Sequence, residues 1–224
     1  MSREMNRREF LKASVTTGAI LSMAPNIVLA EGSKPIQLLE PQTGGGSPIM
    51  QLLWKRMSTK EFSPQPLPPE LLSNILWAAF GINRPDGKRT AASAGNRQEI
   101  DIYAALASGL YLYDPKANLL NPILAQDIRV ATGRQAYVKD AAVNLIYVAD
   151  FSKHGKASDE DKILLSSIAA GLIGENVYLY CASEGLGTVV RVNIDKPALA
   201  KMMKLRPDQK IILSQTVGYP KKTS

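Results

Sequence analysis

The residues from Asp159 to Glu184, DEDKILLSSIAAGLIGENVYLYCASE, form the longest stretch of helical pattern in this sequence. Apolar residues are spread around nearly the whole circumference of the predicted helix, which is typical of a helix that packs on more than one side. Small residues at four positions would let another helix approach closely: Ala169, Ala170, Gly171 and Gly174. One small domain cannot cover all of these faces, so we expect a central helix that also lies in a homodimer interface.

The elements around this helix mix strands and helices without a regular βαβ alternation. Residues 99–115 contain two strand patterns around a short ASG turn, which predicts a hairpin, and residues 141–151 predict a buried strand. The remaining predicted elements are helices at 48–56, 68–81 and 195–205 and strands at 188–194 and 210–220. We therefore expect the α+β class, with a central and mostly antiparallel sheet surrounded by helices.

Residues 31–47, EGSKPIQLLEPQTGGGS, are rich in glycine, proline and polar residues and predict a flexible leader with a break at residues 44–46. The packed domain is expected to begin near Pro48 and to cover 48–224. Its composition, 45% hydrophobic and 21% charged over the whole chain, is ordinary for one globular domain whose core needs no disulfide.

The first thirty residues predict a targeting segment rather than part of the fold. The sequence NRREFLK, with Arg7 and Arg8, precedes a moderately apolar stretch that ends in VLA at Ala30. This pattern resembles a twin-arginine export signal, with the paired arginines followed by hydrophobic residues and a lysine. The apolar stretch is too short and too polar for a permanent membrane anchor. The resemblance implies recognition by the export machinery, cleavage near Ala30, and a periplasmic or otherwise exported protein that carries its cofactor already bound.

Several classes of site lack the residues that they need. Cys181 and His154 are the only cysteine and histidine, so we expect no metal site and no nucleophile–histidine–carboxylate triad. Neither a P-loop nor a G-x-G-x-x-G motif occurs, so a bound phosphate would have to be held by side chains. The net charge of +7, about +5 without the first thirty residues, favours anionic ligands. The basic residues are dispersed and aromatic residues reach only 6%, which argues against nucleic acid.

The stretch KRMSTKEF, residues 55–62, places cations around two hydroxyl groups and has two interpretations. Ser58 and Glu61 have the spacing of a capping box, which would start a helix, although two prolines follow closely and would end it. In the other interpretation the segment is extended, so that Arg56, Ser58 and Lys60 project to the same side. Two cations and a hydroxyl in this arrangement would bind a doubly charged anion.

Two further stretches offer candidate ligands. SAGNRQ, Ser93 to Gln98, puts short polar and amide side chains on a loop that enters a strand, and its structural alternative is an ordinary turn or cap. Lys221 and Lys222 directly follow the last predicted strand, where a pair of lysines is either a solvated tail or an anion contact.

Taken in order, these pieces resemble the FMN-dependent nitroreductase family, from about Trp54 to Lys222. KRMSTKEF is similar to the family's N-terminal phosphate-binding segment, and ASAGNRQ to its P-S-S-x-N-x-Q-P-W segment beside the flavin ring. GENVYLYCASEGLGT is similar to the family's central helix and to the glycine-leucine-glycine stretch that follows it. That helix usually forms much of a homodimer interface. The resemblance assigns FMN contacts to these residues: Arg56, Met57, Ser58, Lys60, Ser93, Ala94, Asn96, Gln98, Arg191, Lys221 and Lys222.

The sequence also departs from the family pattern. Ala92 stands where proline is usual, and Glu99 and Ile100 replace a proline-tryptophan pair. The glutamate-glycine pair that commonly faces the flavin N5 has no clear counterpart, so no catalytic residue is assigned. By position, residues 190–193 would pass that edge, with Arg191 as the polar candidate. A shortened, proline-poor chain of this kind also resembles the SagB-type dehydrogenase branch, whose members oxidise peptide-derived rings.

The resemblance implies an oxidoreductase that passes hydride or electrons through FMN to a small-molecule acceptor, with NAD(P)H as a candidate donor. In such proteins the flavin supplies the chemistry and the protein supplies binding, orientation and electrostatics, so no acid–base dyad is required. The alternative from another class is a non-catalytic protein on the same fold, which either carries a flavin or binds a partner.

Overall fold

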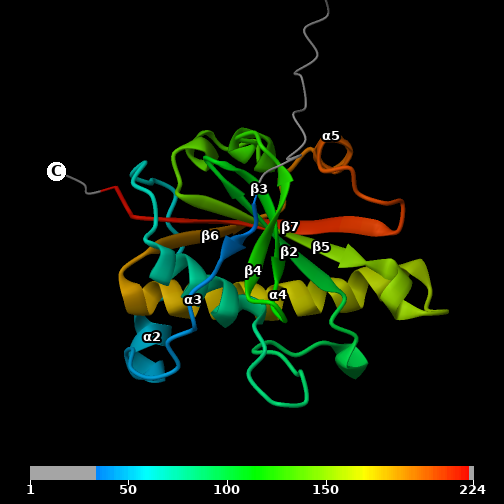
Figure 1. Ribbon diagram of the computed structural model, residues 1–224, viewed down its shortest axis with the longest axis horizontal. Helices are drawn as coiled ribbons and strands as arrows, with labels where there is room; N and C mark the ends of the chain where they lie inside the picture. Colours follow the sequence, from blue (N-terminus) through cyan, green and yellow to red (C-terminus); the bar gives the residue numbers. More distant parts are fainter. Residues whose placement is uncertain (1–33, 222–224) are drawn as a thin grey trace, which may run out of the picture.

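The computed structural model describes residues 34–221, and its centre is a seven-stranded sheet (Figure 1). The strand order is β1-β4-β3-β2-β5-β7-β6, and every neighbouring pair is antiparallel. The strands are β1 (Ile36–Gln37), β2 (Ile100–Leu106), β3 (Gly109–Asp114), β4 (Leu119–Leu124), β5 (Val143–Asp150), β6 (Gly187–Arg191) and β7 (Gln209–Gly218). The predicted export signal and Lys222 lie outside the described residues.

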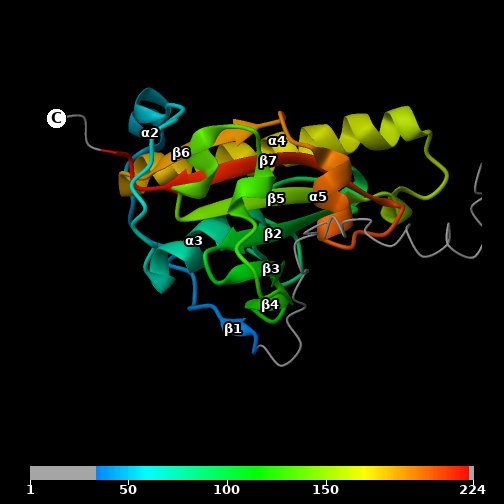
Figure 2. The same ribbon diagram turned by 90° about the horizontal axis from the view of Figure 1, so that it is seen from above.

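Helices cover both faces of this sheet, which confirms the expected α+β class. The α-helices are α2 (Ile49–Lys55), α3 (Pro69–Phe80), α4 (Asp159–Glu184) and α5 (Lys196–Met202). The described residues also contain four short 3₁₀ segments in the connections between elements: η1 (Ala94–Asn96), η2 (Arg129–Thr132), η3 (Ala136–Lys139) and η4 (Phe151–His154). In Figure 1, α3 and α4 lie on one face of the sheet and α5 lies on the other. Figure 2 shows the strands side by side in the spatial order β7, β5, β2, β3, β4 and β1.

The bounds of α4 match the predicted helix because the chain supplies a signal at each end. Ser158 caps the N-terminus, where its hydroxyl oxygen accepts a hydrogen bond from the Asp161 N–H at 3.1 Å. Three acidic residues occupy the first turn, where negative charge is favourable to the helix dipole. Gly185 ends the helix in the left-handed conformation with φ of 68°, which costs glycine nothing.

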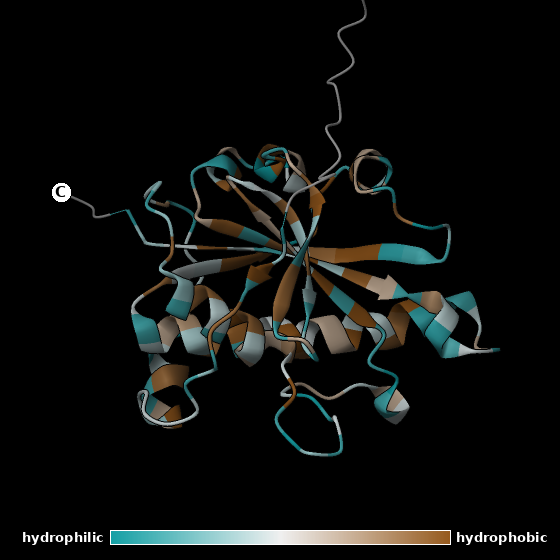
Figure 3. Ribbon diagram, in the orientation of Figure 1, coloured by the Kyte–Doolittle hydropathy of each residue, from teal (hydrophilic) through white to brown (hydrophobic). Residues whose placement is uncertain are grey.

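The core is divided by the sheet into two parts. On one face, α3 and α4 pack against β2 and β5 through residues such as Ile75, Ile102 and Ile173. On the other face, Leu199 of α5 belongs to a second cluster with the alternate residues of the same strands, among them Tyr103 of β2 and Ile146 of β5. Figure 3 shows the central strands coloured mainly hydrophobic and the connecting loops mainly hydrophilic.

The structure corrects the sequence prediction for the segment before Pro48. Ile36 pairs with Leu120 of β4, Leu38 is 4% exposed, and the Leu39 N–H donates to Ser73 Oγ on α3 at 2.9 Å. The chain from Ile36 onward is therefore fixed to the domain rather than a flexible leader. Backbone pairing and one buried leucine hold it, in spite of its glycine and proline content.

Helix α4 has 26 residues and, among the residues that the structure describes, is the one helix long and apolar enough to cross a membrane. Its position against the sheet explains part of that composition. Residues such as Ala170, Ile173 and Val177 are completely buried against the sheet and α3. A second row, which includes Leu164 and Ile168, is more than half exposed on the other side.

Candidate functional site

The segment from Arg56 to Lys60 lies along the free edge of β6. The Thr59 N–H donates to the carbonyl of Thr188 at 2.9 Å, and Thr59 packs directly on Gly187. No helix begins at Ser58, and the chain continues as non-helical backbone to an isolated bridge between Phe62 and Pro220. The capping-box interpretation is therefore wrong, because the two following prolines and the contacts with β6 keep the segment out of a helix.

Tyr178 of α4 contacts this segment at Arg56 and Ser58. Its hydroxyl oxygen lies 3.0 Å from Ser58 Oγ and also accepts a hydrogen bond from the Val190 N–H of β6 at 3.0 Å. The guanidinium carbon of Arg56 lies 5.4 Å from the centre of the tyrosine ring, within the range of a cation–π contact. One side chain thus connects the segment, the helix and the edge strand.

The end of β7 brings a second cation to the same place. The Lys221 N–H donates to the Glu61 carbonyl at 3.0 Å, which sets the C-terminal residues beside the segment. A hollow of about 610 Å³ opens there, and four of the predicted FMN contacts line it: Met57, Ser58, Lys60 and Lys221. A second hollow of about 1020 Å³ shares Gly185, Pro220 and Lys221 with the first.

The donors in this hollow suit a phosphate group. Lys60 and Lys221 are ammonium donors, and Ser58 adds a hydroxyl, while Arg56 lies next to them over Tyr178. Cys181 also lines the hollow, but burial raises the pKa of its thiol, so it is a protonated packing residue rather than a nucleophile. No group of three or more potential metal ligands occurs in the described part of the chain.

The second predicted segment, Ser93 to Gln98, forms a tight loop that contains η1 and is held by hydrogen bonds between its own residues. The Gln98 N–H donates to Ser93 Oγ at 2.9 Å, and the Gln98 side-chain amide donates to Gly87 O and to Asn96 Oδ1. Asn96 and Gln98 both have left-handed backbone, with φ of 53° and 50°. These hydrogen bonds stabilise the loop, and its short residues Ser93 and Ala94 stay outside the core.

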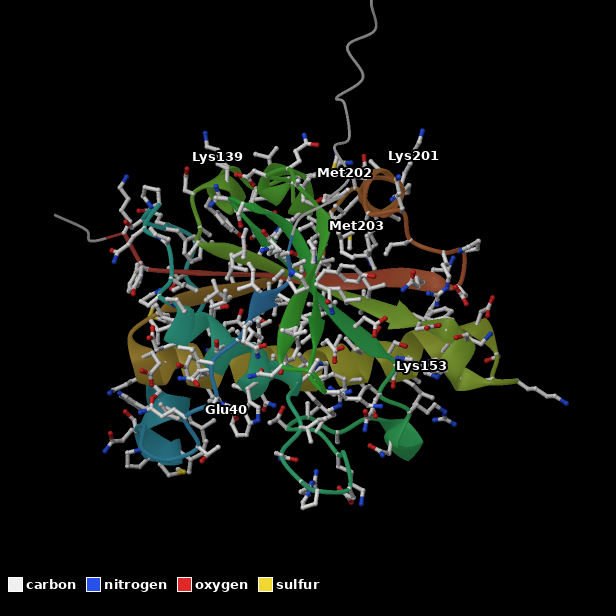
Figure 4. All side chains as sticks on the ribbon, viewed as in Figure 1. Glu40, Lys139, Lys153, Lys201, Met202 and Met203 are labelled. Carbon is white, nitrogen blue, oxygen red and sulfur yellow. The ribbon has the colours of Figure 1, made fainter. Side chains whose placement is uncertain are left out.

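The two predicted segments do not meet within one chain. Lys153, just before the N-terminus of α4, donates from Nζ to the Gln98 carbonyl at 3.0 Å and holds the second segment there (Figure 4). The first segment contacts Tyr178, nineteen residues along the helix from Asp159. At about 1.5 Å per residue, roughly 28 Å of helix separates the two places.

The structure does not support Arg191 as a flavin contact. Its side chain is 4% exposed and faces away from α4, where its guanidinium donates to Thr132 O, Asn144 Oδ1, Ser214 Oγ and Thr216 Oγ1. Burial among neutral groups lowers the pKa of Arg191 to about 10. The neighbouring Val192 and Asn193 are exposed. Arg191 therefore ties β6 to β7 and to η2.

Comparison with known proteins agrees with this fold. The family model described as the Nitroreductase family matches residues 53–219. The chain belongs to the nitroreductase family. A provisionally named nitroreductase of Methanocaldococcus jannaschii is 30% identical over 151 residues, which cover 63% of this chain and 76% of that protein.

Solved structures with the same fold superpose on most of this chain. The crystal structure of a provisionally named nitroreductase from Ralstonia eutropha JMP134 has a TM-score of 0.82 and 42% identity, and the match covers 88% of this chain and 94% of that one. The NADPH:FMN oxidoreductase of Vibrio harveyi, solved with NAD⁺, has a TM-score of 0.60 and 20% identity, with 78% and 69% of the two chains covered. The second likeness concerns the fold alone.

Proposed function

We propose that this protein is an FMN-dependent oxidoreductase of the nitroreductase family that works as a homodimer. One observation supports the cofactor assignment above the others. Ser58, Lys60 and Lys221 come from the two ends of the folded chain and line a single hollow, with Arg56 beside it. Because the sequence contains no P-loop, a bound phosphate would have to be held by side chains. Cations and a hydroxyl group around one hollow are suitable ligands for it.

When bound, FMN would supply hydride and electron transfer, and the roles of this chain are binding and orientation. The two lysines would neutralise the phosphate, and Arg56 would add a planar donor pair at its side. Thr59, bonded to Thr188, would fix the distance between the phosphate and β6. NAD(P)H as donor and a small molecule as acceptor belong to the same proposal, and the resemblance to the family is what suggests them.

The separation of the two predicted segments supports the proposed homodimer. Helix α4 carries an exposed apolar row, Leu164, Ile168 and Leu172, at helical spacing of four residues, with exposed Gly171 beside it. If two copies pair their α4 helices in antiparallel orientation about a twofold axis, the C-terminal end of each helix meets the N-terminal end of the other. The Ser93 to Gln98 loop of one subunit would then reach the phosphate-binding segment of its partner.

Helix α2 adds to the same surface. None of its residues is buried, and Ile49, Met50 and Trp54 are 55%, 73% and 89% exposed. A large exposed apolar patch of this kind marks an interaction site more often than a free surface. It lies next to the C-terminal half of α4, so it would extend the interface between the two copies.

The function is tested by the identity and behaviour of the chromophore. We expect purified protein to be yellow, denaturation to release FMN, and anaerobic NADH or NADPH to bleach the flavin band, which a nitroaromatic or quinone acceptor should restore. Bound FMN that only a chemical reductant bleaches would favour the alternative of a flavin-carrying protein. A colourless protein that FMN cannot reconstitute would contradict the proposal.

Our proposal includes export of the protein through a twin-arginine signal, which only the Arg7 and Arg8 pair supports. Changing both to lysine should leave full-length precursor in the cytoplasm, with no cleavage near Ala30. Normal export of that double variant would remove the twin-arginine interpretation.

A further inference from the structure

A short chain of hydrogen bonds ends at Ser58, and the direction of its first bond is fixed by chemistry. The Val190 backbone N–H can only donate, and it donates to the Tyr178 hydroxyl oxygen at 3.0 Å. Since the Tyr178 oxygen already accepts this bond, its hydroxyl proton is available to donate to its other neighbour, Ser58 Oγ, which also lies 3.0 Å away. In that arrangement Ser58 accepts the hydrogen bond from Tyr178, and its own O–H is left to donate to a third group.

That third group lies in the hollow with Lys60 and Lys221. Ser58 is exposed at the wall of the hollow, so a ligand atom can reach its hydroxyl. Phosphate oxygens of a dianion only accept hydrogen bonds, and a serine that donates suits them. We propose that Tyr178 is a positioning residue that orients the Ser58 hydroxyl as a donor to the phosphate of FMN. The inference rests on the proposed function and names the residue that prepares its phosphate site.

The two parts of the Tyr178 side chain have separable roles. The hydroxyl orients Ser58, while the ring supports the guanidinium of Arg56 at 5.4 Å. Substitution by phenylalanine removes the first role and keeps the second. Hydrogen bonds in a chain polarise one another, so the Val190 N–H should also strengthen the bond that Ser58 makes with the ligand.

The experiment compares FMN with riboflavin, which has the same ring and no phosphate, by fluorescence titration of the apoprotein. In Tyr178→Phe we expect the affinity for FMN to fall about tenfold and that for riboflavin to change less than about twofold, as one hydrogen bond to a charged group implies. Tyr180→Phe is the matched control, because Tyr180 lies on the same helix and packs against the core away from Ser58. It should leave the ratio of the two affinities unchanged.

A second variant tests whether Tyr178 acts through Ser58. Ser58→Ala should lower the affinity for FMN by a similar factor, and in that background Tyr178→Phe should have almost no further effect. An equal loss of affinity for both ligands in Tyr178→Phe, or a full further loss in the double variant, would overturn the positioning role. If the unaltered protein binds riboflavin and FMN equally or binds neither, the proposed phosphate site fails together with the inference.

Discussion

Gly187 of β6 and Thr59 of the Arg56–Lys60 segment lie in direct contact: a β-carbon at position 187 would be 2.7 Å from Thr59 Cγ2 and 2.8 Å from Thr59 Cβ. Real β-carbons do not approach other atoms so closely. The threonine side chain is short and branched at Cβ, so it cannot swing away as a long side chain would. The hydrogen bond from Thr59 N–H to Thr188 O holds the backbone at the same place.

Gly187→Ala should therefore push the segment off the edge of β6. We expect the free energy of unfolding to fall by about 1–3 kcal/mol from overpacking, and the affinity for FMN to fall more than about tenfold. Chemical denaturation and FMN titration measure the two effects. Gly44→Ala is the control, since nothing lies within 4 Å of a β-carbon there. A Gly187→Ala protein with unchanged affinity would show that the segment does not hold the cofactor.

Arg56→Ala tests the phosphate assignment by charge. Removing a charge-assisted contact should weaken FMN binding by about 2 kcal/mol, roughly thirtyfold, and should change riboflavin binding much less. Lys201→Ala serves as control, because Lys201 is exposed on α5, on the face of the sheet opposite α4. Equal FMN affinity in Arg56→Ala and the unaltered protein would exclude Arg56 as a phosphate ligand.

The sequence predicted α4 and the hairpin of β2 and β3 because their signals are local. A cap, a glycine and an unbroken apolar pattern define α4, and two strand patterns with a turn define the hairpin. Strands β1 and β4 were not predicted. Strand β1 has only two residues, and β4 contains Pro122 beside an irregularity in its pairing with β3. Short or proline-containing edge strands depend on their neighbours for pairing.

The candidate site was predictable in part for the same reason. The alternation of Arg56, Ser58 and Lys60 is visible in the sequence, and these residues gather at one place. Tyr178 gave no signal, because its partner Ser58 is 120 residues away and a tyrosine in an apolar helix is ordinarily a core residue. Arg191 was misplaced because strand periodicity separates two faces without saying which one the site occupies.

Ile168→Lys tests the proposed dimer. Ile168 is 53% exposed in one chain and lies at the centre of the apolar row on α4. A lysine there would place an unpaired charge in the interface, so we expect a monomer in sedimentation and a loss of bound FMN. Val130→Lys is the matched control, as Val130 is 64% exposed on η2, away from α4. A monomeric parent protein that binds FMN at full occupancy would contradict the shared site.

Glu99 has a carboxylate that lies inside the protein without a hydrogen-bond partner in the described structure. It is 0% exposed, both of its carboxylate oxygens are unpaired, and it directly precedes β2 at the end of the Ser93 to Gln98 loop. An unpaired buried charge destabilises the folded state, and an amide of the same shape destabilises it less. Glu99→Gln should therefore raise the free energy of unfolding by about 1–3 kcal/mol in chemical denaturation.

The control for this change is Glu40→Gln, an exposed glutamate that Figure 4 labels, which should alter stability by less than about 0.5 kcal/mol. The measurement is made on the apoprotein at low concentration, so that neither cofactor nor a second subunit contributes to stability. Because Glu99 is completely buried within one chain, we expect the gain to persist when the measurement is repeated with saturating FMN. A loss of stability in both states would show that the folded protein pairs this carboxylate, and would contradict the prediction.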